Sequence, residues 1–300
     1  MILKALRLRP GDRIGIIAPA GPVDASEMAP GIALLESQGY EVVPSDHLYD
    51  RQGYLAGEDA ARLHDLHAMF RDGAVRAILC ARGGYGSMRL LEKIDFDLIG
   101  RNPRIFVGYS DITALLWAMH ARTRLVTVHG PMVRELLRDE GRNLEYLLDL
   151  LSSERPPRLD LSGATVLRRG HAVGPLFGGN LSLICHLLGT PFLPSLQGAL
   201  LFIEDRGEPP YRVDRMLTHL RLGGVLEGLA GVVAGSFDDC GEPSELDGVL
   251  AEVLSGLDIP VVSGLPVGHA ARNVPLPIGI PAELDTEAMR LSVLEPCVAF

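Results

Sequence analysis

The chain has 300 residues, of which 47% are hydrophobic and 22% are charged, and its formal net charge is −10. This length exceeds that of a typical single core, so we expect two domains. The acidic balance argues against the clustered Lys and Arg surfaces with which proteins bind nucleic-acid phosphates or anionic membranes. We therefore predict no nucleic-acid partner and no membrane partner.

The N-terminal sequence and the cysteines bear on the cellular compartment. The stretch MILKALRLRPGDRIG has no uninterrupted apolar core of the kind found in signal peptides. No run of the sequence approaches the roughly 20 apolar residues that span a bilayer. The cysteines Cys80, Cys185, Cys240 and Cys297 form no C-x-x-C pair and are expected to be reduced and buried. These features predict a cytoplasmic protein.

The first half of the chain alternates strand and helix patterns. In chain order, apolar runs predict strands over residues 12–18, 40–44, 75–81, 104–108 and 125–128. Helical spacing predicts helices over residues 26–38, 58–70 and about 112–119, and Gly39 is placed to end the first of them. Continuous apolar strands separated by helices indicate a parallel sheet covered on both faces. The fold class is therefore α/β, with a flavodoxin-like sheet that binds ligands at the carboxyl ends of its strands.

The second half is less regular. A charged helix is predicted over residues 134–151, and the Pro- and Ser-rich SSERPPRLDLSG that follows is the best linker candidate. Beyond it, the patterns predict strands over residues 200–204, 231–234 and 261–262 and helices over 181–188 and 213–222. We thus expect a flavodoxin-like domain over residues 1–152, a linker over 153–170 and a smaller mixed α/β domain over 171–300.

The segment FVGYSDITALLWAM places a serine where a strand runs directly into a helix. Ser110 follows Gly108 and Tyr109, so its hydroxyl is expected to point away from the sheet at a helix N-terminus. This is the physical arrangement of a nucleophile elbow, although Ile112 stands where G-x-S-x-G has its second glycine. The alternative is that Ser110 and Asp111 only cap the helix.

A glycine-rich turn, RGGYGS over residues 82–87, follows the third predicted strand. In a parallel sheet it opens on the same edge as Ser110. The N–H of Gly84, or of Gly83, is a candidate for stabilising an oxyanion together with the N–H of Asp111. The turn matches no phosphate-binding motif, and a plain left-handed turn explains it equally well.

A nucleophilic serine needs a base and a group that orients the base. His269 lies in SGLPVGHAARNVPLPIG, an irregular stretch after a buried strand, where functional residues often lie. His129 ends a strand and is a reserve candidate. His64 and His67 share a helix but have no evident third metal ligand, so no metal site is predicted. Helical patterns favour structural roles for the remaining candidates, His120, His186 and His219.

Glu204 ends the apolar strand in LLFIEDRGEPP. A carboxylate at the end of a buried strand is costly unless it has a partner, which could be a histidine, Arg206 or Arg212. Asp205 points to the opposite face of the strand, so the two acids do not form a glycosidase pair.

Taken together, RGGYGS, VGYSD, GGNLS, LLFIEDRGEPPYRVDRML and GLPVGHAARN resemble the LD-carboxypeptidase family of serine peptidases, over nearly the whole chain. The resemblance implies a catalytic triad of Ser110, Glu204 and His269 in a cleft between a flavodoxin-like domain and a smaller C-terminal domain. It also implies a cytoplasmic homodimer without a cofactor. The implied reaction is the release of the terminal D-alanine from murein tetrapeptides during cell-wall recycling.

A carboxypeptidase must also bind a free carboxylate, for which Arg is suited. Arg206 is one candidate, and Arg82 and Arg272 are equal contenders. Asn180 in GGNLS is a candidate substrate contact, but the role of helix N-cap is favoured.

Two other functions are compatible with the sequence. Some members of the family cleave amide-linked aminoacyl- or peptidyl-nucleotide antibiotics, which requires an aromatic platform for the base. The single tryptophan, Trp117, lies in a helix where core packing is expected. The third reading is a non-catalytic two-domain protein that binds a small ligand.

Overall fold

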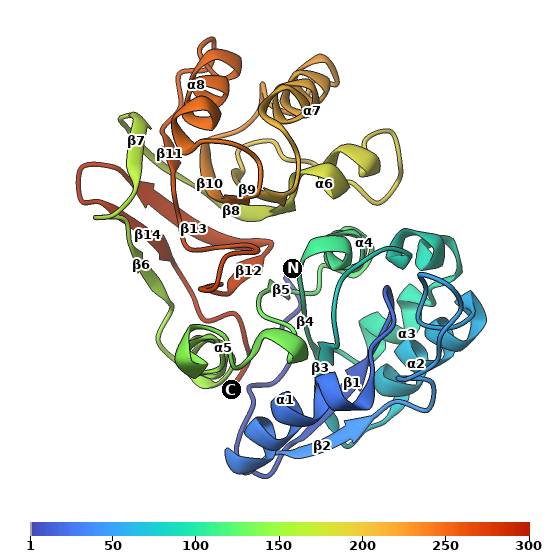
Figure 1. Cartoon of the computed structure of the whole chain (residues 1–300). Coiled ribbons are helices and arrows are strands. Elements are labelled where there is room, and N and C mark those ends of the chain that lie inside the picture. The colour runs from blue at the N-terminus through green and yellow to red at the C-terminus, as the bar shows by residue number, and fades with distance from the viewer. Residues whose placement is uncertain (1) are drawn as a thin grey trace.

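The computed structural model describes residues 2–300, which form two sheets flanked by helices (Figure 1). The strands of the first sheet are β1 (Arg13–Ile17), β2 (Glu41–Pro44), β3 (Val75–Cys80), β4 (Ile105–Gly108), β5 (Thr127–His129) and β12 (Leu276–Ile278). Their order is β12-β5-β4-β3-β1-β2, and β1 to β5 are parallel. The order β2-β1-β3-β4-β5 is that of flavodoxin-like sheets, so the predicted fold class is confirmed.

Helices cover both faces of this sheet. They are α1 (Ala25–Ser37), α2 (Asp59–Arg71), α3 (Phe96–Arg101), α4 (Thr113–Thr123) and α5 (Arg142–Ser152), with short 3-10 turns η1 (Ser87–Lys93), η2 (Ser110–Ile112), η3 (Val133–Glu135) and η4 (Asp139–Gly141). The predicted continuous helix over residues 134–151 is wrong. Asp139, Glu140 and Gly141 all have positive φ angles, which no right-handed helix accommodates, so the long helix begins only at Arg142.

The second sheet is mixed and has eight strands in the order β6-β14-β13-β8-β9-β10-β11-β7. They are β6 (Arg158–Asp160), β7 (Thr165–Arg168), β8 (His171–Asn180), β9 (Leu200–Arg206), β10 (Gly231–Asp238), β11 (Val261–Ser263), β13 (Ile280–Asp285) and β14 (Arg290–Val293). The central strands β8 to β11 are parallel and the outer ones antiparallel. Helices α6 (Leu181–Leu187), α7 (Pro210–Leu222) and α8 (Pro243–Val253) pack beside it.

The two halves of the chain are interleaved. Residues 153–170, expected to be a linker, contain β6 and β7, which form the two edges of the second sheet. In the other direction, β12 comes from the C-terminal part of the chain and pairs with β5 of the first sheet. None of the helices within residues 2–300 is long and apolar enough to cross a bilayer.

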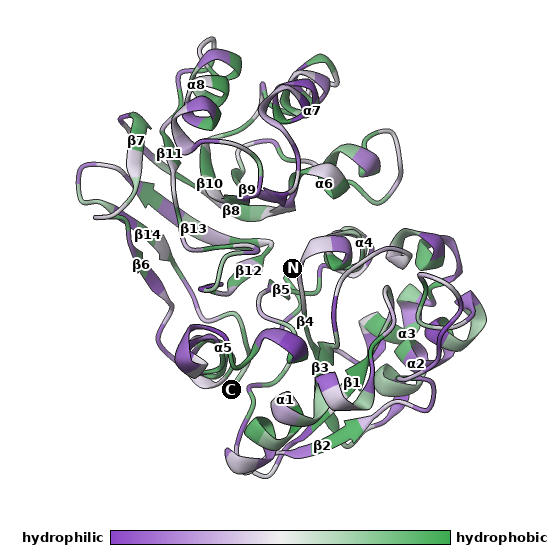
Figure 2. Cartoon of the chain, viewed as in Figure 1, coloured by the Kyte–Doolittle hydropathy of each residue, from purple (hydrophilic) through white to green (hydrophobic). Residues whose placement is uncertain are grey.

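Helix α4 connects the two halves physically. It begins at Thr113, after the turn η2 that starts with Ser110, and its apolar side chains belong to a core cluster that also contains residues of the second sheet. Figure 2 shows hydrophobic segments, in green, in both halves of the chain. Trp117 is fully buried, as predicted, and its Nε1–H donates a hydrogen bond to the carbonyl of Gly178 at the end of β8 (2.7 Å). The backbone N–H of Asn180 donates to the hydroxyl of Thr113 on the same helix (3.1 Å). These contacts set the position of the serine relative to the second sheet.

Replacing Trp117 with Phe is expected to lower the free energy of unfolding by about 1–3 kcal/mol, because the buried carbonyl of Gly178 loses its hydrogen bond. Urea unfolding followed by circular dichroism measures the change. Leu222→Ala is the control, since that side chain is 81% exposed and should have almost no effect. A Trp117→Phe protein as stable as wild type would contradict this role.

Candidate active site

Ser110 lies on a strained turn between β4 and α4. Tyr109 is extended, and Ser110 adopts a left-handed φ of 62°, which for a residue other than glycine costs on the order of 1–3 kcal/mol. Gly83 makes room beside it, because a Cβ atom at Gly83 would lie 3.0 Å from the Ser110 Cβ and 3.1 Å from its Oγ. The turn has the geometry of a nucleophile elbow, with an open space next to the hydroxyl.

Asp111 fastens the glycine-rich turn against this elbow. Its buried carboxylate accepts a hydrogen bond from the backbone N–H of Ser87 (2.9 Å), and the Ser87 hydroxyl donates to the carbonyl of Asp111 (2.6 Å). Burial raises the pKa of Asp111, and the bonds from Ser87 act against that increase. The N–H of Asp111 borders the space at Gly83, at 3.5 Å from where a Cβ atom would lie. The oxyanion roles of the Asp111 and Gly84 N–H groups remain predictions.

The C-terminal half contributes a carboxylate on β9 and a histidine in the loop between β11 and β12. The Nε2 of His269 lies 3.1 Å from the Oγ of Ser110, and its Nδ1 lies 2.6 Å from Oε2 of Glu204. A carboxylate can only accept, so Nδ1 carries the proton of the neutral ring and Nε2 accepts from the Ser110 hydroxyl. Gly268, with φ +123°, allows the close approach, because a Cβ atom there would lie 2.8 Å from Oε2 of Glu204. The three predicted residues thus form one hydrogen-bonded chain across the two sheets.

The environment tunes both members of the His269–Glu204 pair. Glu204 is fully buried, and this burial raises its pKa against the opposing effect of His269. Burial by itself lowers the pKa of His269, whose side chain is 13% exposed, but the hydrogen bond and charge of Glu204, together with the charges of Asp205 and Asp238, outweigh burial and raise the pKa. The imidazole is therefore a stronger base than a free histidine, and it is protonated up to a higher pH.

The other candidate histidines are placed differently. His129 is fully buried against Tyr109 and Phe202, and burial lowers its pKa to about 3, so it stays neutral. The Nε2 of His67 accepts a hydrogen bond from the backbone N–H of Asp95 (3.0 Å). Residues 2–300 contain no group of three or more His, Cys, Asp or Glu side chains that could hold a metal ion.

Some of the predicted substrate-binding side chains are held by bonds within the protein, and others are exposed to solvent. Asn180 is buried, caps α6 by accepting from the N–H of Leu183, and donates to Asp205 (2.9 Å), consistent with the favoured N-cap role. Arg82 points to the carbonyl of Pro22 (3.4 Å). Arg206 is exposed and pairs with Asp239 at 3.3 Å.

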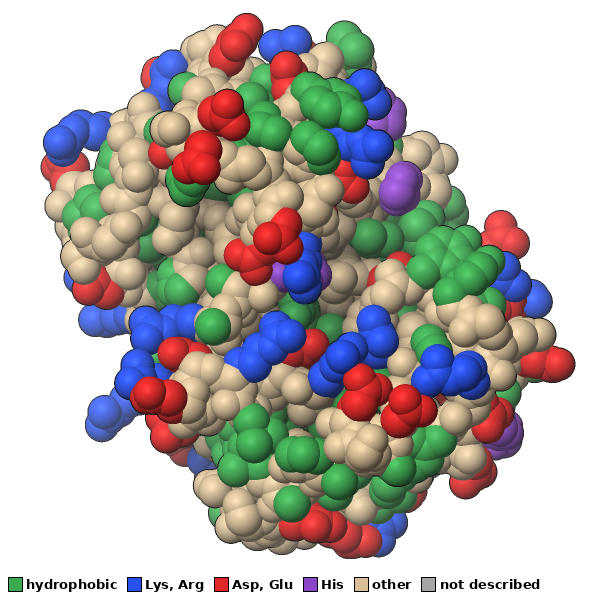
Figure 3. All heavy atoms as spheres, in the orientation of Figure 1, with side chains coloured by type: hydrophobic (Ala, Val, Ile, Leu, Met, Phe, Trp, Pro, Cys, Tyr) green, Lys and Arg blue, Asp and Glu red, His purple; other side chains and the backbone are tan. Residues whose placement is uncertain are grey.

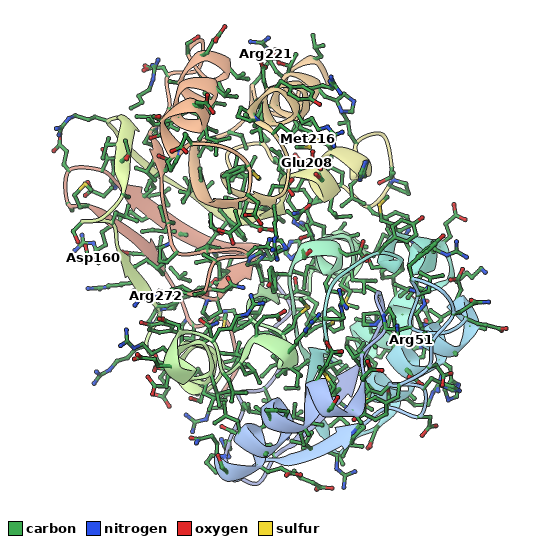
Figure 4. All side chains as sticks on the ribbon, in the orientation of Figure 1. Arg51, Asp160, Glu208, Met216, Arg221 and Arg272 are labelled. Carbon is green, nitrogen blue, oxygen red and sulfur yellow. The ribbon has the colours of Figure 1, made fainter. Side chains whose placement is uncertain are left out.

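Arg272 lies where the two halves meet (Figure 4), and its Nε is 2.8 Å from the carboxylate of Asp139.

A solvent-open hollow of about 510 Å³ lies next to His269. We call it the His269 hollow, and its lining residues are Arg138, Asp139, Arg206, Asp238, Asp239, His269 and Ala271. In Figure 3, charged side chains of both signs gather around a His near the centre of the face shown, where the upper and lower halves meet. A peptide that enters this hollow reaches the histidine from solvent.

Sequence reasoning missed several residues that build the site. Ser87 ties the glycine turn to the elbow, and Asn273 accepts from the N–H of Gly268 (3.0 Å), which supports the loop of His269. Arg138 lies within residues 134–151, which were predicted to form a helix. The Asp139-Glu140-Gly141 sequence was the available signal, since a glycine after two polar residues is typical of a helix break.

Two sheets with a serine, a histidine and a carboxylate in hydrogen-bond contact between them have the groups of a serine-type hydrolase. The comparisons with known proteins agree with this class. Residues 14–130 match the LD-carboxypeptidase N-terminal domain, and residues 173–284 match the LD-carboxypeptidase C-terminal domain. The chain belongs to the LD-carboxypeptidase family of serine peptidases.

Individual relatives cover almost the full chain. A probable murein peptide carboxypeptidase of Bacillus subtilis is 41% identical over 99% of this chain and 95% of its own length. The crystal structure of a muramoyltetrapeptide carboxypeptidase from Oxalobacter formigenes is 32% identical, with a TM-score of 0.84 over 94% of this chain and 97% of that one. The structure of MccF in complex with glutamyl sulfamoyl guanosine is 25% identical, with a TM-score of 0.93 over 99% of this chain and 100% of that one.

The Glu204–His269 contact generates a prediction about pH. Only neutral His269 can accept the serine proton, so the reactivity of Ser110 should fall as the pH falls through the raised pKa of His269. In Glu204→Gln the largest raising effect is lost, while burial and the smaller effects of Asp205 and Asp238 remain, so this acid limb should move to lower pH and the maximal rate should decrease. The pH dependence of inactivation by a fluorophosphonate measures both.

Glu283→Gln is the matched control, because Glu283 contacts His171 (2.8 Å) on the surface, away from Ser110. It should leave the profile unchanged. An acid limb at the same pH in Glu204→Gln and wild type would mean that Glu204 does not set the pKa of His269.

Proposed function

We propose that this chain is a metal-independent serine carboxypeptidase that releases the terminal D-alanine from murein tetrapeptides in cytoplasmic cell-wall recycling, as a homodimer. The hydrogen-bonded chain Ser110–His269–Glu204 at the edge of an open hollow carries the proposal. The murein peptide carboxypeptidase at 41% identity supports the choice of substrate.

The first half of the reaction forms an acyl-enzyme. Glu204 holds the Nδ1–H of His269, and Nε2 takes the proton of the Ser110 hydroxyl. The Ser110 Oγ forms a bond to the carbonyl carbon that precedes D-alanine. The imidazolium then gives its proton to the amide nitrogen, the C–N bond breaks, and D-alanine leaves.

The developing negative charge on the carbonyl oxygen needs donors that are already in place. The N–H of Asp111 and the N–H of Gly84, with Gly83 as the alternative to the latter, are the proposed donors. The bonds between Asp111 and Ser87 support this role, because they hold both backbone segments in one arrangement. In the second half of the reaction, His269 removes a proton from water, which hydrolyses the ester on Ser110.

A second candidate function is cleavage of an aminoacyl-nucleotide, given the likeness to MccF bound to glutamyl sulfamoyl guanosine. Trp117 cannot stack on a base, since it is fully buried. Tyr85, directly after Gly84, and Tyr54 are exposed and form an edge-to-face pair with centroids 5.5 Å apart. This pair is the observation that favours the second candidate, because exposed aromatic rings are what a base stacks on.

Ser110→Ala is expected to reduce D-alanine release from L-Ala-γ-D-Glu-meso-diaminopimelate-D-Ala by about 10⁴-fold or more, because the members of a triad act as a unit. The assay detects released D-alanine through its coupled oxidation and is run with and without a chelator. Wild-type release should resist the chelator.

Ser26→Ala, which removes an exposed serine hydroxyl at the start of α1, is the control and should keep full activity. If the rate of D-alanine release falls by less than about tenfold in folded Ser110→Ala, Ser110 is not the nucleophile. If wild type released no D-alanine but hydrolysed an aminoacyl sulfamoyl adenylate, the second candidate function would replace the first.

A further inference from the structure

Some of the charged side chains that line the His269 hollow form ion pairs, and others do not. Arg206 contacts Asp239 at 3.3 Å, and Asp139 is held by Arg272 from outside the hollow at 2.8 Å. The exposed side chain of Arg138 forms no hydrogen bond or ion pair within residues 2–300, although its charge acts on the nearby carboxylate of Glu135, where it opposes the rise in pKa that burial causes. The hollow therefore presents a guanidinium whose donors face solvent beside the histidine.

The backbone next to Arg138 is strained. Asp139, Glu140 and Gly141 follow it with φ angles of 52°, 58° and 84°. Two consecutive left-handed residues other than glycine cost on the order of 1–3 kcal/mol each. This strain stops the chain from continuing as a helix after Arg138 and leaves its side chain at the rim of the hollow. Such strain persists where the surrounding contacts over-determine it.

Three contacts tie this segment to the loop that carries His269. Arg272 binds Asp139, the Nδ2–H of Asn143 donates to the carbonyl of Ala271 (3.0 Å), and the N–H of Asn273 donates to Oδ1 of Asn143 (3.0 Å). Asn143 is fully buried, so its bonds are not exchanged with water. The position of Arg138 relative to His269 is therefore fixed by the same contacts that hold the catalytic loop.

We infer that Arg138 binds the free C-terminal carboxylate of the substrate, the group that distinguishes the end of a peptide from its interior. This inference rests on the proposed carboxypeptidase function. A guanidinium offers two parallel N–H donors that match a carboxylate, and Arg138 can offer them without breaking an existing ion pair. Arg82 is directed to the carbonyl of Pro22 (3.4 Å), and Arg272 is engaged by Asp139.

The remaining charges of the hollow fit this assignment. Asp238 also lines it and has no cation partner within residues 2–300. A substrate carboxylate is repelled by Asp238 and attracted by Arg138, which orients the peptide end toward the segment after η3. Arg206 is the competing cation, because its exposed ion pair with Asp239 is weak and can be exchanged.

The test compares the tetrapeptide with its C-terminal D-alanine amide, which lacks the negative charge. Wild type should prefer the acid by about 10- to 100-fold in kcat/KM, mainly through KM, since a charged hydrogen bond is made in both the ground state and the transition state. In Arg138→Ala the acid should lose this factor and the preference should shrink to less than about threefold. Arg138→Lys should keep part of it.

Arg142→Ala is the matched control, since Arg142 lies four residues further along the chain and pairs with Glu140 on the surface. It should behave as wild type. The inference is overturned if Arg138→Ala prefers the acid as strongly as wild type does. It is also overturned if the preference is lost in Arg206→Ala but kept in Arg138→Ala.

Calorimetric titration of both peptides into Ser110→Ala, with and without Arg138→Ala, separates this inference from the proposed reaction. If wild type releases no D-alanine, the proposed function fails. Binding that favours the acid through Arg138 still supports the carboxylate site in that case. Equal or absent binding of the acid and the amide overturns the site as well.

Discussion

The contact between His269 and the buried carboxylate of Glu204 is the interaction on which the rest of the site depends. A fully buried carboxylate is expensive unless it is paired, and only its Oε2 has a partner within residues 2–300. The imidazole offsets part of that cost and is in turn fixed in one tautomer. Gly268 makes the 2.6 Å contact sterically allowed. The base strength of His269 follows from this contact, because burial alone would lower its pKa.

The second constraint is the rigid placement of one sheet against the other. Ser110 follows β4 of the first sheet, Glu204 lies on β9 of the second, and His269 lies in the loop between β11 and β12, 159 residues from Ser110. Helix α4 bridges the two sheets, with Trp117 and Thr113 bonded to the end of β8. The crossing of β12 into the first sheet adds a further connection. The hollow beside His269 consequently has walls from both halves, and the same loops that position the base position Arg138.

The sequence predicted the parallel sheet well, because its strands are continuous apolar runs and its helices have regular spacing. It did not predict β6, β7, β8, β12, β13 or β14. Four of these strands have only three or four residues and show no clear periodicity, and the longer β8 contains Gly174, Pro175, Gly178 and Gly179, which weaken a strand pattern. The continuous helix over residues 134–151 was wrong because charged residues with helical propensity were placed in a strained turn by tertiary contacts, above all Asp139 with Arg272. The local sequence made a catalytic role plausible for each of Ser110, Glu204 and His269, but only the resemblance to a family linked the three residues. Arg138 was not among the arginines that the sequence suggested, because ion pairing is not visible in the sequence.

The most direct test of the account replaces the serine with a thiol that reports on His269. The four native cysteines are buried, so in Ser110→Cys the new thiol is the one that reacts with iodoacetamide in the folded protein. Contact with His269 should lower the pKa of this thiol well below the ordinary value of about 8.5, and the additional replacement His269→Ala should bring the pKa back toward that value. An ordinary thiol pKa in both proteins would contradict the claim that Ser110 and His269 are in contact before substrate binds.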